Sequence, residues 1–370
     1  MIFGFLLAVA FNPFIYAAAT VPRWALLSVA LPLLLWQQSP SYFTPLHLIG
    51  CLLVSWCALS LAWTANGYDG LGELGQLALI AQAFVLGNRL GSMREIFKGL
   101  AIGLIVSSLL VATPLYQFMI GPVSVEHEGL LGNRNMLSEA AVLTLLGCIG
   151  YRLWWFIPGI LPSIFVWPQE RASMLALIVA AGCWLWSYSK WLTVACGAAV
   201  IGAGLSYAFF GDRISSTSQL IQIWSDTSKG LTFWGHGIGS FLTLFPFLTS
   251  TIDIVVSRPE HAHNDFLEII FDYGFIGAFL YASFTVVAIG VADRIYRPIL
   301  AAFLVIGCFS FPWHVPVTAF IGACVIGTVA GRGIDFRNFN DVWRNRIFSW
   351  IGLFQERGRC HQTYASGGTL

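Results

Sequence analysis

Long apolar stretches follow one another along most of this chain, and short polar segments separate them. A transmembrane helix needs roughly 20 successive residues that are mostly apolar. Hydrophobic residues make up 57% of the sequence and charged residues only 10%, whereas about 25% of the residues in a soluble domain are charged. The sequence therefore predicts an all-α, polytopic membrane protein and excludes an ordinary soluble domain.

The apolar windows predict about twelve transmembrane helices. They lie near residues 2–20, 24–37, 44–63, 75–91, 97–119, 135–151, 153–167, 172–188, 191–210, 265–289, 298–312 and 314–331. Residues 1–331 then form a single membrane domain, with one large loop at 211–262. Residues 332–370 form a tail in which arginines alternate with Phe and Trp, a pattern typical of a helix on an anionic membrane surface.

The distribution of Lys and Arg orients these predicted helices, because short cytoplasmic loops accumulate positive charge. With both termini in the cytoplasm, most of the 19 basic residues fall in cytoplasmic loops or in the tail. The loop 211–262 then lies on the outer side. The net charge of +1 gives no sign of a nucleic-acid partner, so the predicted partner is the lipid bilayer.

The segment 258–277, RPEHAHNDFLEIIFDYGFIG, places two histidines immediately before a predicted helix on the outer side. Asp265 and Glu268 have the spacing of a capping box at the start of that helix. The positive end of a helix dipole disfavours a charged imidazole, and a general base must be neutral. His263 is therefore the candidate base, and a purely structural interfacial histidine is the alternative.

The same predicted helix carries Gly274, Ala278 and Ala282 at intervals of four residues. Small residues at this spacing let a neighbouring helix approach closely, so this stripe indicates helix packing. A zinc site needs three or four protein ligands. The sequence has no HExxH motif, and we predict neither a metal ion nor a cofactor.

Arginines stand at the start of two further predicted helices on the outer side. Arg134 lies in the sequence GNRN, and Arg171 opens the window near 172–188. A helix N-terminus binds phosphate, and arginine adds bidentate recognition of phosphate oxygens. These two residues are candidate anion ligands, with interfacial anchors that reach toward water as the alternative.

Four short motifs together resemble those of the O-antigen ligase and polymerase (WaaL/Wzy) superfamily of membrane glycosyltransferases. The pattern H-N-x9-G-x-x-G begins at His263, and R-x3-L begins at Arg171. The pattern G-N-x-N spans 132–135, and a glycine-rich run ending in Phe spans 234–241. The motifs occur in the family's order, and the resemblance covers residues 130–290.

The resemblance implies a GT-C-like fold and a metal-independent, inverting glycosyltransferase on the periplasmic face of the bacterial inner membrane. Such an enzyme moves a glycan from undecaprenyl pyrophosphate to an acceptor hydroxyl. His263 would activate the acceptor, Arg171 would hold the pyrophosphate, and Arg213 is the best candidate for a second essential arginine. Substrate contacts are expected from Arg134, Asn135, Arg258, His261, Asn264 and His236.

Two features depart from the family pattern. Glu170 stands where the family usually has Ser before the arginine of R-x3-L, and the large loop lacks an R-x3-W pattern. Because this second pattern is missing, Arg213 is assigned by its position in the loop alone.

The acceptor decides among several related activities. Lipid A-core as the acceptor would make the protein an O-antigen ligase, which the single large loop favours. A growing chain would make it a polymerase of the Wzy type, and pilin or another protein would make it an O-oligosaccharyltransferase. A non-enzymatic transporter of lipid-linked sugars is a further alternative, and it would place ionisable residues within the membrane. The apolar windows hold few such residues, among them Glu139 and Asp272.

Overall fold

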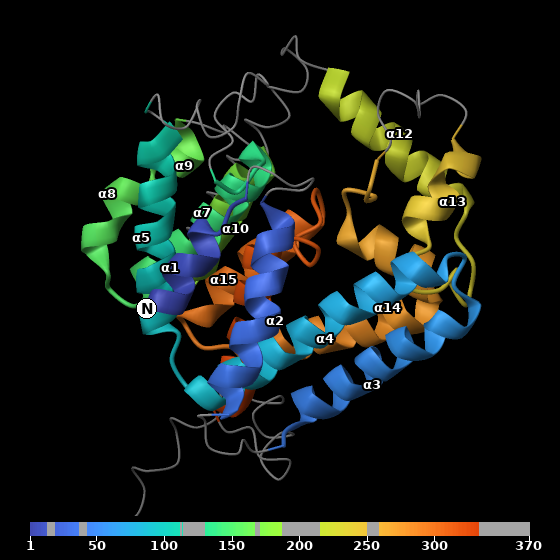
Figure 1. The fold of residues 1–370 in the computed structure, drawn as a ribbon, viewed down its shortest axis with the longest axis horizontal. Helices are drawn as coiled ribbons and strands as arrows, with labels where there is room; N and C mark the ends of the chain where they lie inside the picture. The colour runs from blue at the N-terminus through green and yellow to red at the C-terminus, as the bar shows by residue number, and fades with distance from the viewer. Residues whose placement is uncertain are drawn as a thin grey trace, which may run out of the picture.

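A computed structural model describes residues 1–12, 19–36, 43–111, 113, 130–166, 171–186, 215–249 and 259–332. Within these ranges the regular secondary structure is entirely helical, as the apolar pattern predicts (Figure 1). The predicted window at 191–210 and residues 333–370 of the predicted tail lie outside the described residues.

Three of the described helical segments are long and apolar enough to cross a membrane, whereas the sequence predicts about twelve. They are α3 (Pro45–Leu59) with its continuation η1 (Ser60–Trp63), α4 (Gly67–Leu90) and α14 (Asp265–Val291). Helix α4 begins well before the predicted window at 75–91, because the Asn66 side chain caps it by accepting the Tyr68 backbone N–H at 3.0 Å.

The other helices of the apolar windows are shorter. They are α1 (Ile2–Val9), α2 (Thr20–Trp36), α5 (Arg94–Val111), α7 (Arg134–Gly150), α10 (Arg171–Trp186), α15 (Tyr296–Gly307) and α16 (Pro316–Gly331). The window at 153–167 is not one helix. It contains the short pieces η2 (Trp154–Phe156), α8 (Ile157–Ile160) and α9 (Pro162–Phe165), because Pro158 and Pro162 cannot sit in a helix interior without disrupting it.

Helix α16 lies at the centre of the core, and nearly every residue along it is buried. Glycines let α4 pack closely against it. A Cβ atom on Gly87 would lie 2.1 Å from the Cys324 carbonyl oxygen, and one on Gly327 would lie 1.9 Å from the Phe84 carbonyl oxygen. Close backbone contact through small residues is the usual means of helix association in membranes.

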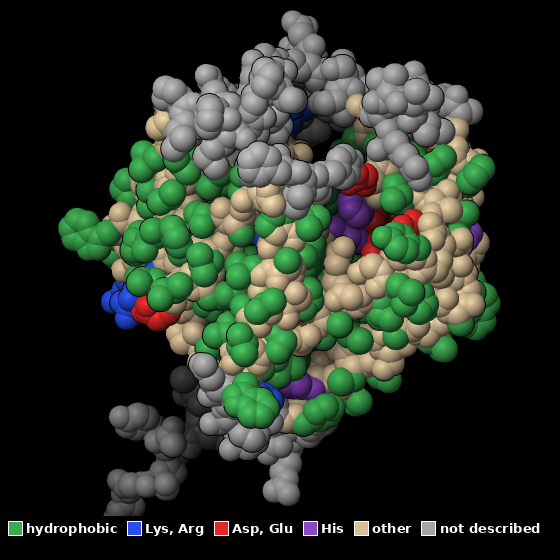
Figure 2. All heavy atoms as spheres, viewed as in Figure 1, with side chains coloured by type: hydrophobic (Ala, Val, Ile, Leu, Met, Phe, Trp, Pro, Cys, Tyr) green, Lys and Arg blue, Asp and Glu red, His purple; other side chains and the backbone are tan. Residues whose placement is uncertain are grey.

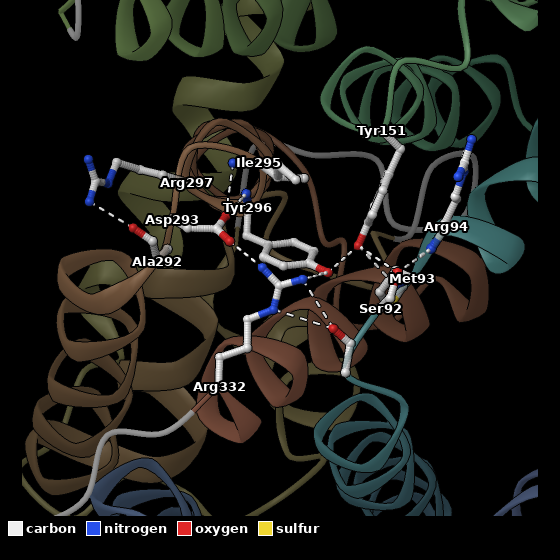
Figure 3. Close-up of polar contacts among 11 residues, drawn as sticks. Ser92, Met93, Arg94, Tyr151, Ala292, Asp293, Ile295, Tyr296, Arg297 and Arg332 are labelled. Atoms are coloured by element: carbon white, nitrogen blue, oxygen red, sulfur yellow. Dashed lines mark hydrogen bonds and ion pairs between the residues drawn. The ribbon is translucent and has the colours of Figure 1, made fainter.

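A polar network around Arg332 ties several helix ends together (Figure 3). The Arg332 guanidinium pairs with the Asp293 carboxylate and lies 4.7 Å from the centre of the Tyr296 ring. The Tyr296 hydroxyl contacts the Tyr151 hydroxyl, which accepts the Met93 backbone N–H at 2.9 Å. The connections that follow α4, α7 and α14 therefore meet Arg332, the C-cap of α16, at one end of the molecule.

This network also fixes the direction of three helices. Tyr151 follows α7, and Asp293 comes directly after the C-cap of α14. The Trp184 indole of α10 donates to the Arg294 carbonyl at 3.2 Å, so the C-terminal end of α10 lies beside the same connection. The N-terminal ends of these helices point away from the network and begin with Arg134, Arg171 and Asp265.

The described part of the large loop is folded onto the N-terminal half of α14. It contains two short helices, α12 (Ser215–Lys229) and α13 (Phe241–Leu248). Figure 1 shows both beside the start of α14. The Trp224 indole of α12 donates to the Ala262 carbonyl at 3.0 Å, which joins the loop to the segment that carries the predicted base.

Candidate functional site

The chain turns sharply at His263 before α14 begins. Asn264 caps the helix by accepting the Leu267 backbone N–H at 3.0 Å. His263 has a φ of 52°, in the left-handed region that few residues other than glycine adopt. Such backbone strain is concentrated at functional sites, and here it sets the direction of the predicted base.

The predicted capping box is wrong, although its two residues do lie in the first turn. Asn264 is the cap and Asp265 is the first helical residue. The Glu268 carboxylate instead accepts the Ala262 backbone N–H at 2.7 Å and lies 2.8 Å from Nδ1 of His261. It therefore stabilises the segment that precedes the turn at His263.

A third histidine, His314, reaches this cluster from the connection between α15 and α16. Its Nε2 lies 3.5 Å from Oε1 of Glu268, and its ring centre lies 4.0 Å from that of His261. Phe311 contacts both His261 and His263, with ring centres 4.6 and 5.0 Å away. Figure 2 shows histidine and acidic side chains gathered on the face where α14 begins.

The surroundings shift the pKa values of the three histidines in different directions. Burial and the neighbouring His261 lower the pKa of His263 below its ordinary value. Burial also acts to lower the pKa of His261, but the adjacent Glu268 carboxylate outweighs it and raises the pKa above its ordinary value. Burial and His261 lower the pKa of His314 to about 3. His263 is therefore neutral at pH 7, the state that a general base requires.

His261, Glu268 and His314 also have the residue types of a metal site. One ligand atom from each lies within 4.8 Å of the others, and two histidines with one glutamate form a common catalytic zinc set. The 2.8 Å contact between His261 and Glu268 and the close approach of the two imidazole rings favour a hydrogen-bonded cluster. Two imidazole rings that bind one tetrahedral ion would point away from each other on either side of the ion, whereas these two rings lie against each other.

The glycine-rich run packs against a break in α14. Gly274 has a φ of 67° within the helix, and a Cβ atom there would lie 2.2 Å from the Phe233 carbonyl oxygen. The backbone N–H of Gly237 donates to the freed Asp272 carbonyl at 2.8 Å. The predicted packing stripe is therefore wrong, because Gly274 interrupts the helix and Ala282 is exposed.

His236 holds this run in place. Its backbone N–H donates to the Phe271 carbonyl at 2.9 Å, and its Nε2 lies 2.6 Å from the Gly230 carbonyl oxygen. The imidazole ring also lies against the Phe271 ring, with the centres 4.6 Å apart. These contacts give His236 a structural role, and its contact with a substrate stays a prediction.

The predicted arginines lie at helix starts. Arg134 and Arg171 are the first residues of α7 and α10, and both are exposed. The Asn133 side chain caps α7 by accepting the Asn135 backbone N–H at 2.7 Å, which accounts locally for the G-N-x-N motif. Arg213 and Arg258 lie outside the described residues.

Arg23 is buried instead of lying in an outer loop, where the sequence places it. It belongs to α2, is 2% exposed and donates to backbone carbonyls of Leu7 at 2.8 Å, Ala8 at 2.9 Å and Leu130 at 3.0 Å. This cation is buried because α1 and the segment before α7 pack over it. The hydrogen bond from Arg23 to Leu130 thereby joins α2 to the segment that precedes Arg134.

Carboxylates flank the histidine cluster along α14, where they are buried, and along α4, where Glu73 is half-buried. Asp265, Glu268 and Asp272 are all buried on one side of α14, and Glu73 of α4 lines the same cavity. The sequence points to Asp272 but not to Glu73 or His314. The signal for both was a polar residue at the edge of an apolar window, but their proximity to α14 depends on long-range packing.

Compared with known proteins, the chain matches no family model and shows no significant similarity to a curated sequence.

Proposed function

We propose that this protein is a membrane glycosyltransferase that moves a glycan from undecaprenyl pyrophosphate to an acceptor hydroxyl, acting as an O-antigen ligase on lipid A-core. The observation that carries this proposal is the position of His263, neutral at pH 7 and held in a strained turn directly before α14. The helices that carry Arg134 and Arg171 begin at the same end of the molecule. A neutral base and phosphate ligands on one side are what this reaction needs.

In the proposed reaction, His263 removes the proton from the acceptor hydroxyl as its oxygen attacks the anomeric carbon. The bond between that carbon and the pyrophosphate oxygen breaks, and the electron pair leaves with undecaprenyl pyrophosphate. Attack opposite to the leaving group inverts the anomeric configuration. Arg171, with Arg213 from the large loop, would stabilise the negative charge that develops on the pyrophosphate.

The proposal places this end of the molecule in the periplasm, both termini in the cytoplasm, and about twelve helices of a GT-C-like fold in the inner membrane. The network around Arg332 supports this orientation. It joins connections that the charge distribution assigns to the cytoplasm, and Arg94, Arg297 and Arg332 all lie in or beside it (Figure 3). The helices that begin with Arg134 and Arg171 point the other way.

Complementation tests the activity and the acceptor together. The wild type and His263→Ala are expressed in a strain that lacks its O-antigen ligase and in one that lacks its polymerase, and the glycan ladder is read on a gel. We expect the wild type to restore a ladder on lipid A-core in the first strain and His263→Ala to fail. Restored chain length in the second strain alone would make the protein a polymerase. Full rescue by His263→Ala would contradict the proposed base.

A transporter for lipid-linked sugars is the second candidate function. The observation in its favour is the set of carboxylates in apolar helices, which includes the buried Asp265 and Asp272 and the half-buried Glu73. Ionisable groups within a membrane often mark a substrate or proton pathway. Uptake of a lipid-linked sugar by vesicles containing the protein, with no new glycosidic bond formed, would favour the transporter.

A further inference from the structure

The helices α3, α4 and α14 enclose a cavity of about 360 Å³. Figure 1 shows these three helices side by side. They are also the described helices that are long and apolar enough to cross a membrane. The cavity therefore lies within the part of the protein that is best suited to a bilayer.

Most of the cavity wall is apolar. Val54 of α3, Ile80 and Phe84 of α4, and Phe284 of α14 line it away from the histidine cluster. The residues of α4 that line the cavity include Glu73 and Phe84, which are separated by roughly 16 Å of helix. A slot of this kind suits an alkyl or isoprenyl chain, because burial of each CH₂ group away from water is favourable.

Carboxylates line the other end of the cavity. Asp265 and Asp272 are each 2% exposed. Both carboxylate oxygens of Asp265 and Oδ1 of Asp272 make no hydrogen bond of regular geometry among the described residues, although the backbone of Trp313 interacts with Asp265 and that of Phe241 with Asp272. Buried polar atoms are normally paired, so these oxygens indicate a ligand that donates hydrogen bonds.

The charge and the spacing of these groups define the head of that ligand. The described residues that line the cavity include no Lys or Arg, so an anionic head would meet carboxylates without a compensating cation. Asp265 and Asp272 are two helical turns apart, roughly 10 Å. A single ammonium group cannot reach both, whereas a sugar carries donors over this distance.

We propose that this cavity binds an amphiphile with an apolar chain and an uncharged, polyhydroxylated head whose hydroxyls donate to Asp265 and Asp272. This inference concerns binding alone and does not depend on the proposed glycosyl transfer. The cavity would separate a sugar-bearing ligand beside the carboxylates from phosphate groups at the exposed arginines. The sugar hydroxyls would then bind the carboxylates, and the phosphate groups would bind the arginines.

Photo-cross-linking of the full-length protein in phosphatidylcholine nanodiscs tests this site. The probe is dodecyl maltoside with a diazirine on its alkyl chain, and labelled peptides are located by mass spectrometry. We expect labelling on α3, α4 and α14. Unlabelled dodecyl maltoside should compete at least about tenfold better than dodecyl phosphate or dodecyltrimethylammonium, an affinity difference on the scale of one or two hydrogen bonds.

Two alanine-to-tryptophan variants show whether the label reports the cavity. Ala81 lines the cavity, whereas Ala282 is exposed on α14 and does not line it. Ala81→Trp should lower labelling of these helices about tenfold, because its ring occupies the space of the chain. Ala282→Trp should leave the labelling unchanged. Equal labelling of the two variants would overturn the proposed site.

The aspartates test the head group separately. Asp265→Asn and Asp272→Asn keep the shape of the side chain and should reduce the advantage of dodecyl maltoside over the charged competitors. Competition by dodecyl phosphate or dodecyltrimethylammonium equal to that of dodecyl maltoside in the wild type would overturn the head assignment. If the site binds maltoside but the complementation assay shows no ladder, the transferase proposal alone fails.

Discussion

The imidazole of His261 and the carboxylate of Glu268 lie 2.8 Å apart across the start of α14. This contact joins the segment before the helix to the first helical turn. It holds the chain on both sides of His263, the proposed base, which lies between the two residues in the sequence. The Ala262 backbone N–H donates to the same carboxylate at 2.7 Å, so one side chain secures the whole turn.

Glu268→Gln should destabilise the protein more at pH 5.5 than at pH 8.5. Glu268 raises the pKa of His261, so their charge pairing stabilises the fold below the ordinary histidine pKa near 6.5 and is lost as the pH rises through the raised value. Loss of a charged hydrogen bond costs about 1.5–3 kcal/mol. Thermal unfolding in detergent at the two pH values measures the difference.

The comparison uses the wild type at each pH as its control, because the neighbouring groups His263, His314, Glu260 and Glu73 are the same in both proteins. An equal loss of melting temperature at pH 5.5 and pH 8.5 would show that His261 gains no proton-linked stability from Glu268.

The acid limb of the activity profile should have its midpoint below pH 6.5. The lowered pKa of His263 keeps its imidazole neutral to a lower pH than an ordinary histidine, and only the neutral form can accept the proton of the acceptor. Initial rates of glycan transfer between pH 5 and pH 9 measure this limb. A midpoint clearly above 6.5 would be inconsistent with His263 as the base.

Gly274→Ala should destabilise the protein by about 2 kcal/mol or more. Its φ of 67° is unfavourable for alanine, and the new Cβ atom would overlap the Phe233 carbonyl oxygen at 2.2 Å. Gly72→Ala is the matched control, since a Cβ atom there meets nothing within 4 Å. Alanine in that helix should stabilise by about 0.5–1 kcal/mol. Similar melting temperatures for the two variants would contradict the break in α14.

Arg23→Met should destabilise the protein by roughly 3 kcal/mol or more. It removes the donor of four backbone carbonyls, those of Leu7, Ala8, Ala19 and Leu130, and each buried acceptor left without a partner costs about 1–3 kcal/mol. The exposed Arg94 provides the control, because Arg94→Met removes no buried contact of this kind. Thermal unfolding of both variants in detergent checks the difference, and equal melting temperatures would argue against the buried role of Arg23.

The sequence predicts the local features of this structure well. The helical class follows from the apolar windows, and the start of α14 follows from the polar residues that precede Asp265. These features depend on residues close together in the chain. Helix lengths were predicted less well, since Asn66 starts α4 early and Pro158 and Pro162 divide another window.

The site itself depends on contacts that no local pattern specifies. His314 and Glu73 come from other helices or connections and meet α14 only after the helices pack. Gly274 looks like a helix-packing glycine in the sequence. Its left-handed backbone becomes evident only when the glycine-rich run takes the freed carbonyl of Asp272.

Transfer by the purified protein tests the central claim most directly. The full-length protein is given a glycan on undecaprenyl pyrophosphate and an acceptor lipid A-core, and product formation is followed by mass spectrometry for the wild type, His263→Ala and the control Lys98→Ala, which changes a half-buried residue outside the proposed site. We predict product from the wild type and the control. The rate should fall about 10²–10⁴-fold in His263→Ala, with an unchanged melting temperature. A rate for folded His263→Ala within about twofold of the wild type would contradict a general base at this position.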